Sequence, residues 1–347
     1  MKQDTTKRCV RKRGLAFVLL SVALVLLMVA NLIFGSVDIP VGDVITVLLG
    51  GEAEHEVWGT IILETRLPQA CTALLAGAAV AVSGLMLQTL FGNPLAGPEV
   101  LGINSGAGLG VAVVMLLAHG SLQVGDSGLS GYAALLAGAF AGAMLIISVI
   151  IFLSSFLRNK VFLLIAGVAI SYLTSSVISV LNYVATAEGV HSYLVWGMGS
   201  FGAVSNAQLP LFALLLLVLL SCTLFMMKPL NALLLGDLYA RNLGVNVRLV
   251  RLLLLCITGL LTAVVTAFCG PVAFLGLAVP HLARLSIGGN DHKALLPSTM
   301  LLGGCVALLC NILTHIPGES GLLPLASITP LVGAPVIIYV ILRDRAL

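Results

Sequence analysis

The sequence predicts an all-α membrane protein with about ten transmembrane helices and both termini in the cytoplasm. Hydrophobic residues make up 59% of the 347 residues and charged residues only 9%, whereas a soluble domain carries about 25% charged residues. The apolar runs are long enough to cross a bilayer and do not alternate with polar residues, which favours helices over barrel strands. The basic residues fall on one side of the predicted spans. This composition excludes a water-soluble globule, a disordered chain and a nucleic-acid-binding domain.

The apolar runs define a single transmembrane domain over residues 14–347, which follows a basic cytoplasmic N-terminus over residues 1–13. The first run is too long for the apolar core of a signal peptide, and no A-x-A cleavage site follows it. We therefore expect it to be retained as a span. The predicted spans cover residues 14–34, 67–91, 97–118, 132–157, 161–184, 207–227, 249–268, 271–287, 294–315 and 329–342.

The charges between the spans test this topology. With the N-terminus inside, sixteen of the 17 Lys and Arg residues fall in cytoplasmic segments, and only Arg66 lies outside. The positive-inside rule predicts such a split, and a missed span would scramble it. The outer loops are acidic instead, with Asp38, Asp43, Glu52, Glu54, Glu56, Glu64, Asp126, Glu188 and Glu319.

The spans contain few ionisable side chains. Glu99, His281 and Arg284 are the candidates, and all three lie near a predicted cytoplasmic boundary. Ion-coupled carriers usually keep titratable groups inside the bundle, so this distribution disfavours a secondary transporter. That alternative stays open, because backbone carbonyls at broken helices can also hold ions. An intramembrane enzyme would need paired catalytic groups at depth, which the pattern does not provide. The seven cysteines form no CxxC pair and the six histidines are scattered, so no metal site is predicted.

Small residues and prolines shape the predicted bundle. Gly138 and Gly142 form a small-xxx-small pair, for which we expect helix packing, with a dimer seam or a close-walled pathway as the alternative. Prolines disfavour helix just before themselves, so several helix breaks are expected. Two of these breaks are each followed by a Leu-Gly pair, a faint sign of internal duplication. The predicted breaks are Asn93-Pro94, Gly97-Pro98, Gly270-Pro271 and Val279-Pro280.

The longest cytoplasmic loop, residues 228–248, predicts a short amphipathic helix outside the membrane. Leu235, Leu238, Tyr239 and Leu243 follow helical spacing and would form one apolar face. Asp237 suits the start of such a helix and Gly244 its end. The helix could lie at the lipid interface or insert into a groove on a cytoplasmic partner. No lysine follows a glycine, so the phosphate-binding G-x-x-x-x-G-K-[ST] motif is absent from the sequence. If ATP drives this protein, a separate chain hydrolyses it.

Two long motifs resemble the permease family of bacterial ABC importers for iron-siderophores, haem and vitamin B12. The first runs from Arg66-Leu67-Pro68 through Gly92-Asn93-Pro94-Leu95-Ala96-Gly97-Pro98 to Leu101-Gly102. The second is Gly270-Pro271-Val272-Ala273-Phe274-Leu275-Gly276-Leu277-Ala278-Val279-Pro280-His281-Leu282-Ala283-Arg284. The resemblance covers nearly the whole chain from the first span onward.

The resemblance implies a type II ABC importer permease in the bacterial cytoplasmic (inner) membrane. Such a subunit is not itself an enzyme: it forms a homodimer, binds two cytoplasmic ATPase subunits that use ATP, and receives substrate from an extracytoplasmic binding protein. The resemblance implies no cofactor bound by this chain. The cargo would be an iron-siderophore, haem or cobalamin. The family's ATPase-coupling helix matches the amphipathic segment, with Gly236, Asp237, Leu238, Tyr239, Ala240, Leu243 and Gly244.

Further site residues follow from the same resemblance. Arg66 matches an outer arginine that pairs with acidic residues of the binding protein, while Gln69 stands where relatives often carry a basic residue. The run 322–330 also departs from the Glu-Leu-Pro-x-Gly-Val-like pattern of many relatives. We therefore hypothesise that the docking protein presents basic or polar contacts to Glu52, Glu54 and Glu56. Asn93, Pro94, Asn104 and Ser105 are predicted near the translocation path, with helix capping or a helix break as the alternative for each.

Overall fold

The computed structural model describes residues 2–117, 129–157, 159–316 and 321–344. Each regular element in these ranges is helical, which confirms the predicted all-α fold. Every predicted span contains a helix. Six of these helices are long and apolar enough to cross a membrane alone. They are α1 (Lys2–Ile33), α4 (Leu67–Phe91), α6 (Leu129–Phe156), α7 (Lys160–Val184), α12 (Val247–Cys269) and α14 (His292–Thr314).

The remaining predicted spans are bent or short. Helices α9 (Leu209–Phe225) and α10 (Met227–Leu234) meet at an angle of 49° and together pass as one broken span. Helices α5 (Ile103–Leu117), α13 (Leu275–Ile287) and α15 (Leu325–Asp344) contain shorter apolar stretches. The chain thus supplies one helix, or one bent pair, for each of the ten predicted runs.

Several predicted boundaries were wrong, and the backbone explains why. The third span was placed from residue 97, but Pro98–Leu101 forms a 3-10 turn, η2, and α5 begins only after Gly102, whose φ is +76°. The eighth was placed from residue 271, but α13 begins at Leu275, after extended backbone and Phe274 with φ +66°. The last helix begins at Leu325, four residues before the predicted start, and the Pro324 carbonyl accepts its first hydrogen bonds, from the Ser327 and Ile328 amides.

Short helices that were not predicted lie between the spans. Helices α2 (Val41–Leu48) and α3 (Glu56–Thr60) follow α1, and a π-helical turn, η1 (Ile61–Arg66), runs without a break into α4. Helix α8 (Ala187–Gly197) and the 3-10 turn η3 (Phe201–Ala203) separate α7 from α9. None of these is long enough to cross a membrane, so none changes the number of spans.

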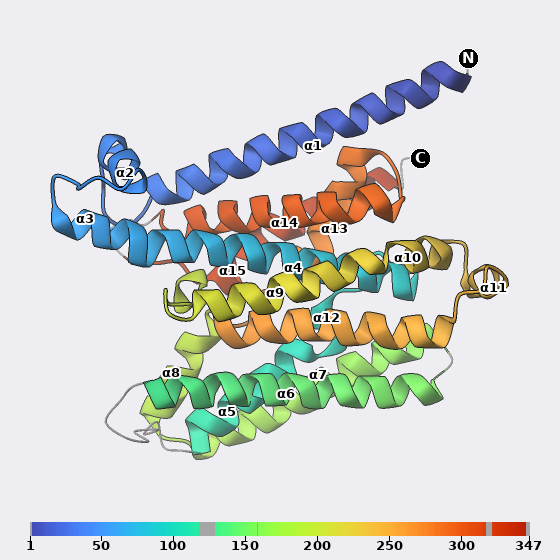
Figure 1. Ribbon diagram of the computed structural model, residues 1–347. Coiled ribbons are helices and arrows are strands. Elements are labelled where there is room, and N and C mark those ends of the chain that lie inside the picture. Colours follow the sequence, from blue (N-terminus) through green and yellow to red (C-terminus); the bar gives the residue numbers. More distant parts are fainter. Residues whose placement is uncertain (1, 118–128, 158, 317–320, 345–347) are drawn as a thin grey trace.

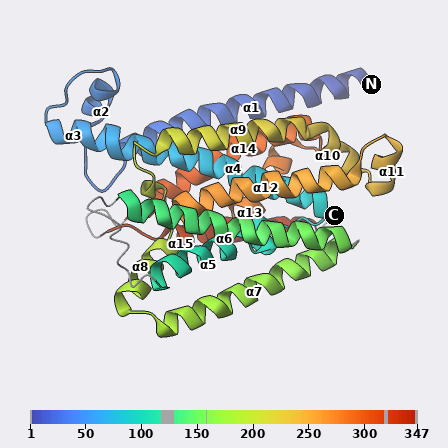
Figure 2. The same ribbon diagram turned by 60° about the horizontal axis from the view of Figure 1, so that its bottom comes forward.

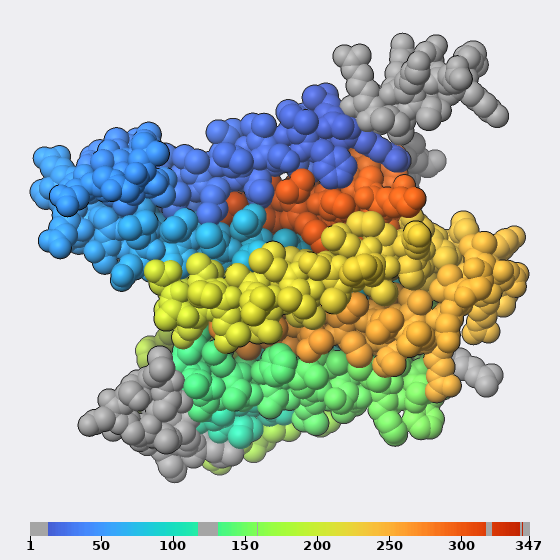
Figure 3. Space-filling view, in the orientation of Figure 1, coloured from blue at the N-terminus to red at the C-terminus, as the bar shows by residue number. Residues whose placement is uncertain are grey.

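The long helices run side by side, and the connecting helices gather at two opposite ends (Figure 1). One end, the α11 end, holds α10, α11 (Asp237–Asn242), the beginning of α1 and the end of α15. The opposite end, the α3 end, holds α2, α3 and α8. Figure 2 shows α7 at the rim, while α4 runs through the middle of the bundle. On the face drawn in Figure 3, α1, α14, α9, α12 and α6 form successive bands.

Glycine allows the central helices to touch along their backbones. A Cβ at Gly84 of α4 would lie 1.7 Å from the carbonyl oxygen of Gly276 on α13, and one at Gly77 would lie 2.3 Å from that of Gly303 on α14. Side chains at these positions are impossible without moving a backbone. Such close packing replaces the hydrophobic drive that lipid does not provide.

The predicted pair Gly138 and Gly142 packs in the same way. A Cβ on Gly142 of α6 would lie 2.1 Å from the carbonyl oxygen of Gly106 on α5, and Gly138 faces Gly110 on the same helix. The helix-packing interpretation of this pair is therefore confirmed.

Candidate functional site

Helix α11 stands out at the α11 end because its apolar side chains face outward. Leu238 is 76% exposed, Tyr239 66% and Leu243 64%, whereas Ala240 is fully buried and anchors the helix. The helix is shorter than the predicted 236–244 segment. Gly236 and Gly244 flank it instead, with φ values of +98° and +82° that only glycine adopts at little cost.

Asp237 fixes α11 to two long helices. Its carboxylate accepts a hydrogen bond from Lys160 Nζ at the start of α7, with an N–O distance of 2.9 Å, and lies 3.5 Å from Arg251 Nη2 of α12. The three side chains are 17–30% exposed, so solvent screens the pairs and each contributes little stability. Their geometric effect is to join α11 to both α7 and α12.

The two broken segments of the bundle meet in its interior. Asn104 Nδ2 of α5 donates to the Val272 carbonyl at 3.4 Å, and Thr266 of α12 donates to Asn104 Oδ1 at 2.9 Å. A Cβ on Gly276 would lie 2.8 Å from Pro98 Cδ. The similar Gly-Pro breaks noted in the sequence thus lie against each other, with Asn104 as the polar contact between them.

The loop between α4 and η2 is held by a turn of its own and by a contact with α13. Asn93 Oδ1 accepts from the Leu95 amide at 2.9 Å, which closes a turn, and the His281 Nε2 atom lies 3.0 Å from the Pro94 carbonyl oxygen. Asn93 is half-buried and Pro94 exposed. His281 therefore anchors a loop.

Arg284, the other basic candidate in the bundle, contacts α4. It donates to Gln88 Oε1 at 2.8 Å, and Gln88 Nε2 lies 3.3 Å from the Leu277 carbonyl. Among the described residues no group of three or more His, Cys, Asp or Glu side chains gathers as in a metal site.

The four residues predicted near the path separate into two pairs. Pro94 contacts the middle of α13 and Asn93 closes the turn beside it, while Asn104 contacts the break before α13, and Ser105 is half-buried next to it on α5. Asn93 and Pro94 thus have a local role in a turn, and Asn104 has one in an interhelical contact. Their place along a translocation path stays a prediction.

Arg66, predicted to contact a docking protein, is 5% exposed. Its guanidinium donates to the carbonyls of Leu32 and Ile33, at 2.8 and 2.7 Å, and also to the Val37 carbonyl. The last carbonyls of a helix lack partners and carry the negative end of its dipole. Arg66 therefore caps the end of α1, and its charge is not presented to the outside in this conformation. Sequence reasoning missed this role because it depends on tertiary contact.

A chain of amides lies near Arg66 at the α3 end. Gln69 Nε2 donates to Asn311 Oδ1 at 3.0 Å, and Asn311 Nδ2 donates to Asn31 Oδ1 at 2.8 Å. Gln69 and Asn311 also line a cavity of about 210 Å³, whose other side is formed by Leu322–Leu325. The two departures from the family pattern, at position 69 and in the run 322–330, thus lie at one place.

The acidic outer loop forms a hollow of about 750 Å³ between α2 and α3. Four glutamates line it, together with glycines and small apolar side chains. Among the lining residues there is no basic side chain. The glutamates are Glu52, Glu54, Glu56 and Glu64.

Helix α7 carries a polar stripe that sequence reasoning missed. Tyr172, Ser176, Ser179 and Tyr183 follow helical spacing and are all exposed, Tyr172 by 74% and Tyr183 by 90%. The serine hydroxyls donate to the carbonyls four residues earlier, which reduces the cost of placing them in a membrane. The spacing is present in the sequence, but the apolar residues between these positions make the segment read as an ordinary apolar span. A stripe of this kind fits a protein partner or a water-filled path better than lipid tails.

Comparisons with known proteins agree with this architecture. The chain is 36% identical over 326 residues to the vitamin B12 import system permease protein BtuC of Klebsiella pneumoniae subsp. pneumoniae, covering 94% of this chain and 93% of that protein. It is 36% identical over 295 residues to the hemin transport system permease protein HmuU of Yersinia pestis, covering 85% of each.

The fold is likewise similar to a solved structure of a metal-chelate type ABC transporter in an inward-facing conformation. The TM-score is 0.81, the sequence identity 29%, and the match covers 95% of this chain and 99% of the other. The family model described as the FecCD transport family matches residues 23–343. With its bundle of broken and unbroken spans, and with this match over nearly its whole length, the chain belongs to the FecCD transport family.

Proposed function

We propose that this chain is the membrane-spanning permease subunit of an ATP-driven importer for a bulky metal chelate, placed in the bacterial cytoplasmic membrane with its α11 end inside. The observation that carries the proposal is α11 itself: an ion-paired helix at one end of the bundle that turns Leu238, Tyr239 and Leu243 outward. An apolar helical face of this kind fits a groove on a partner protein.

The partner at α11 is proposed to be an ABC ATPase, one for each permease copy. Nucleotide binding would move the ATPase groove, and α11 would follow it. Because Asp237 joins α11 to α7 and α12, that motion would reach the two helices directly. The bundle would then alternate between outward- and inward-open states biased by nucleotide. This chain contributes the path and the coupling, and ATP stays with the partner subunit.

The polar stripe of α7 supports a homodimer. Two copies that face each other through α7 would place their tyrosines and serines along a shared path, away from lipid. A large ligand needs a path that does not hold it tightly, and scattered hydroxyls on a mainly apolar wall fulfil that condition. The cargo classes of BtuC and HmuU, vitamin B12 and hemin, make a metal chelate the proposed cargo class here.

The acidic hollow at the α3 end supports a docking site for an extracytoplasmic binding protein with basic or polar contacts. Arg66 would act there only indirectly, by fixing α1 against the start of α4. Charge reversal of Glu52, Glu54 and Glu56 to lysine is expected to weaken docking, measured with the purified binding protein. Unchanged docking would overturn this part of the proposal.

Co-purification tests the central claim. The tagged chain is extracted in mild detergent and the intact complex is weighed by mass spectrometry. Two copies of this chain with two copies of an ATPase are expected. Leu238→Asp should remove the ATPase, because it places a charge in the apolar contact. The matched control is Leu49→Asp, at a leucine that is 83% exposed at the α3 end, and it should retain the ATPase.

Two results would contradict the proposal. A complex without any ATPase, in detergent that preserves a known importer, would favour the alternative of a secondary transporter. An ATPase that stays bound to Leu238→Asp would show that α11 is not its docking element.

A further inference from the structure

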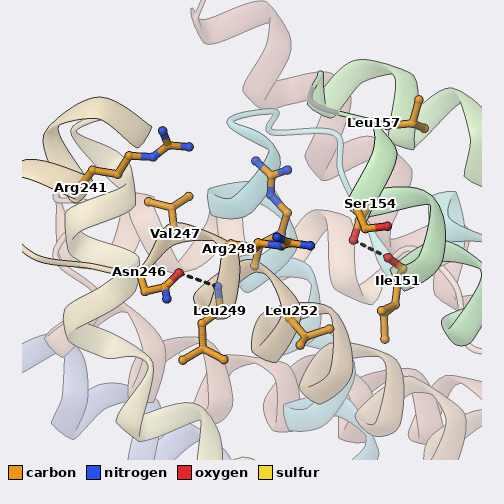
Figure 4. Close-up of a pocket in the computed structure, with 11 residues that line it drawn as sticks. Ile151, Ser154, Leu157, Arg241, Asn246, Val247, Arg248, Leu249 and Leu252 are labelled. Carbon is orange, nitrogen blue, oxygen red and sulfur yellow. Dashed lines mark hydrogen bonds between the residues drawn. The ribbon is translucent and has the colours of Figure 1, made fainter.

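A second hollow, of about 670 Å³, lies at the α11 end between the end of α6 and the start of α12. Figure 4 shows Arg241 reaching from α11 and Arg248 from α12, with Ser154 of α6 across from them. Arg251 of α12 completes the basic lining. We name this site the basic hollow; the proposed transport cycle assigns no ligand to it.

The basic hollow has an excess of positive charge. Its lining includes the guanidinium groups of Arg241, Arg248 and Arg251, and no acidic side chain is among the residues that line it. Asp237 contacts Arg251 alone of the three among the described ion pairs. The Nε atom of Arg251 is buried and has no hydrogen-bond partner within the described part of the chain. Arginine is suited to bind phosphate because its planar group presents several donors at once.

The backbone adds to this charge. Helix α12 begins at Val247, so its positive dipole end lies at the hollow, and arginines are unfavourable there unless an anion is present. Asn246 caps the helix by accepting from the Leu249 amide at 3.1 Å, and the Ser154 hydroxyl donates to the Ile151 carbonyl at 2.7 Å (Figure 4). The Ser154 hydroxyl and the Asn246 side-chain oxygen are thus occupied, and the arginines are the charged donors of the lining.

The rim of the basic hollow is apolar. Leu249 is 50% exposed and Leu252 39%, both on the spanning helix α12, and Ile151 and Leu157 line the α6 side. A free phosphate ion has no apolar surface, so contacts with these leucines would not stabilise its binding. A phospholipid has both parts, an anionic headgroup for the arginines and acyl chains for the leucines. Basic pockets between spans at a membrane surface bind anionic headgroups in this manner.

We propose that the basic hollow binds the phosphate headgroup of an anionic phospholipid from the leaflet at the α11 end, with the acyl chains against Leu249 and Leu252. Arg251 lines the basic hollow and also contacts Asp237 of α11. The same arginine would therefore lie between the bound headgroup and α11. The lipid would therefore fix the geometry through which α11 acts on α12.

The test measures lipid binding to the purified full-length chain by native mass spectrometry. Phosphatidylglycerol and phosphatidylcholine with identical acyl chains are titrated separately. Arg241→Gln combined with Arg248→Gln removes two charges from the hollow and spares the Arg251–Asp237 pair. The matched control, Lys228→Gln combined with Lys293→Gln, removes two exposed charges from the same end of the molecule outside the hollow.

The wild-type chain and the lysine variant are expected to prefer phosphatidylglycerol. The arginine variant should bind it about thirty-fold more weakly, as expected for two basic residues at an anionic membrane surface. Equal phosphatidylglycerol binding by the two double variants would overturn the proposal. So would displacement of the lipid by millimolar inorganic phosphate, which would assign the site to a free anion. A loss of ATPase from the complex with unchanged lipid binding would assign the arginines to a protein contact instead.

Discussion

Helices α4 and α7 have the same length, 25 residues each, and both are apolar enough to cross a membrane, yet their surroundings are opposite. In α4, 21 residues are buried; in α7, only four. Alanine and glycine dominate the buried stretch of α4, so neighbouring backbones approach closely. Larger side chains cover α7, with a polar stripe among them. The rest of the chain thus covers almost all of α4, whereas most of the surface of α7 is left for lipid or a second protein copy to cover.

The largest expected effect is a methyl group placed inside α4. Gly84→Ala sets a Cβ 1.7 Å from the Gly276 carbonyl oxygen, a backbone atom that no rotamer change can move aside. We expect destabilisation of about 3 kcal/mol or more, with loss of folded protein in detergent. Thermal unfolding of the purified chain measures it. Gly14→Ala is the control, because nothing lies within 4 Å of its added Cβ. Equal unfolding temperatures for the two variants would refute the close packing of α4.

A matched pair of truncations tests the comparison itself. Leu87→Ala on α4 removes a fully buried side chain and should cost about 2–5 kcal/mol. Leu173→Ala on α7 removes one that is 67% exposed and should cost well under about 1 kcal/mol in the isolated chain.

The same pair is then measured in the assembled complex. If a second copy covers α7, Leu173→Ala should destabilise the dimer more than the isolated chain. An identical small cost in both states would leave α7 facing lipid and would remove the support for the homodimer.

The next effect concerns the start of α4, where Arg66 holds α1. Arg66→Gln loses charge-assisted hydrogen bonds and leaves the Leu32 and Ile33 carbonyls unpaired, so we expect destabilisation of about 2 kcal/mol. Hydrogen exchange should become faster at the end of α1 before it does elsewhere. Arg66→Lys, which keeps the charge without the planar group, should be intermediate. Normal stability with weaker binding-protein docking would instead support the role implied by the resemblance.

The smallest effect concerns Asp291, which caps α14, the helix packed along α4. The Asn231 amide and the Lys293 backbone amide hold the pKa of Asp291 below its ordinary value of 3.8. The folded chain therefore favours the carboxylate, and its contribution is present above that value and is lost as the pH falls through the lowered pKa.

Unfolding measured at decreasing pH should show this loss in the wild type only. Asp291→Asn should abolish that part of the pH dependence and lower the neutral-pH stability by a small amount, because the neutral amide lacks the contribution that the carboxylate makes above its ordinary pKa. An unaltered pH profile in the variant would show that another group is responsible.

The sequence allowed prediction of those features that depend on composition and local spacing. The ten runs and the apolar face around Leu238 and Tyr239 were predictable because hydropathy and helical period are local signals. The breaks at Gly97-Pro98 and Gly270-Pro271 were predictable for the same reason, although the helices that follow them start several residues later. The break predicted at Val279-Pro280 was wrong, because α13 continues through Pro280. The role of Arg66 was not, since its carbonyl partners lie about thirty residues away. The spacing of the polar stripe of α7 is present in the sequence, but only the structure shows that these side chains are exposed together.

The glycine contacts also have a mechanical consequence. Gly77 and Gly84 join α4 to α14 and α13, while Gly106 and Gly110 join α5 to α6. Backbones in such contact cannot slide past each other without a clash, so each set behaves as a stiff block. Both blocks pack against α12, where Gly259 lies against the side chain of Ile147 and not against a backbone. We therefore expect a change of shape during transport to fall between the blocks, along α12, which is also the helix that Asp237 attaches to α11.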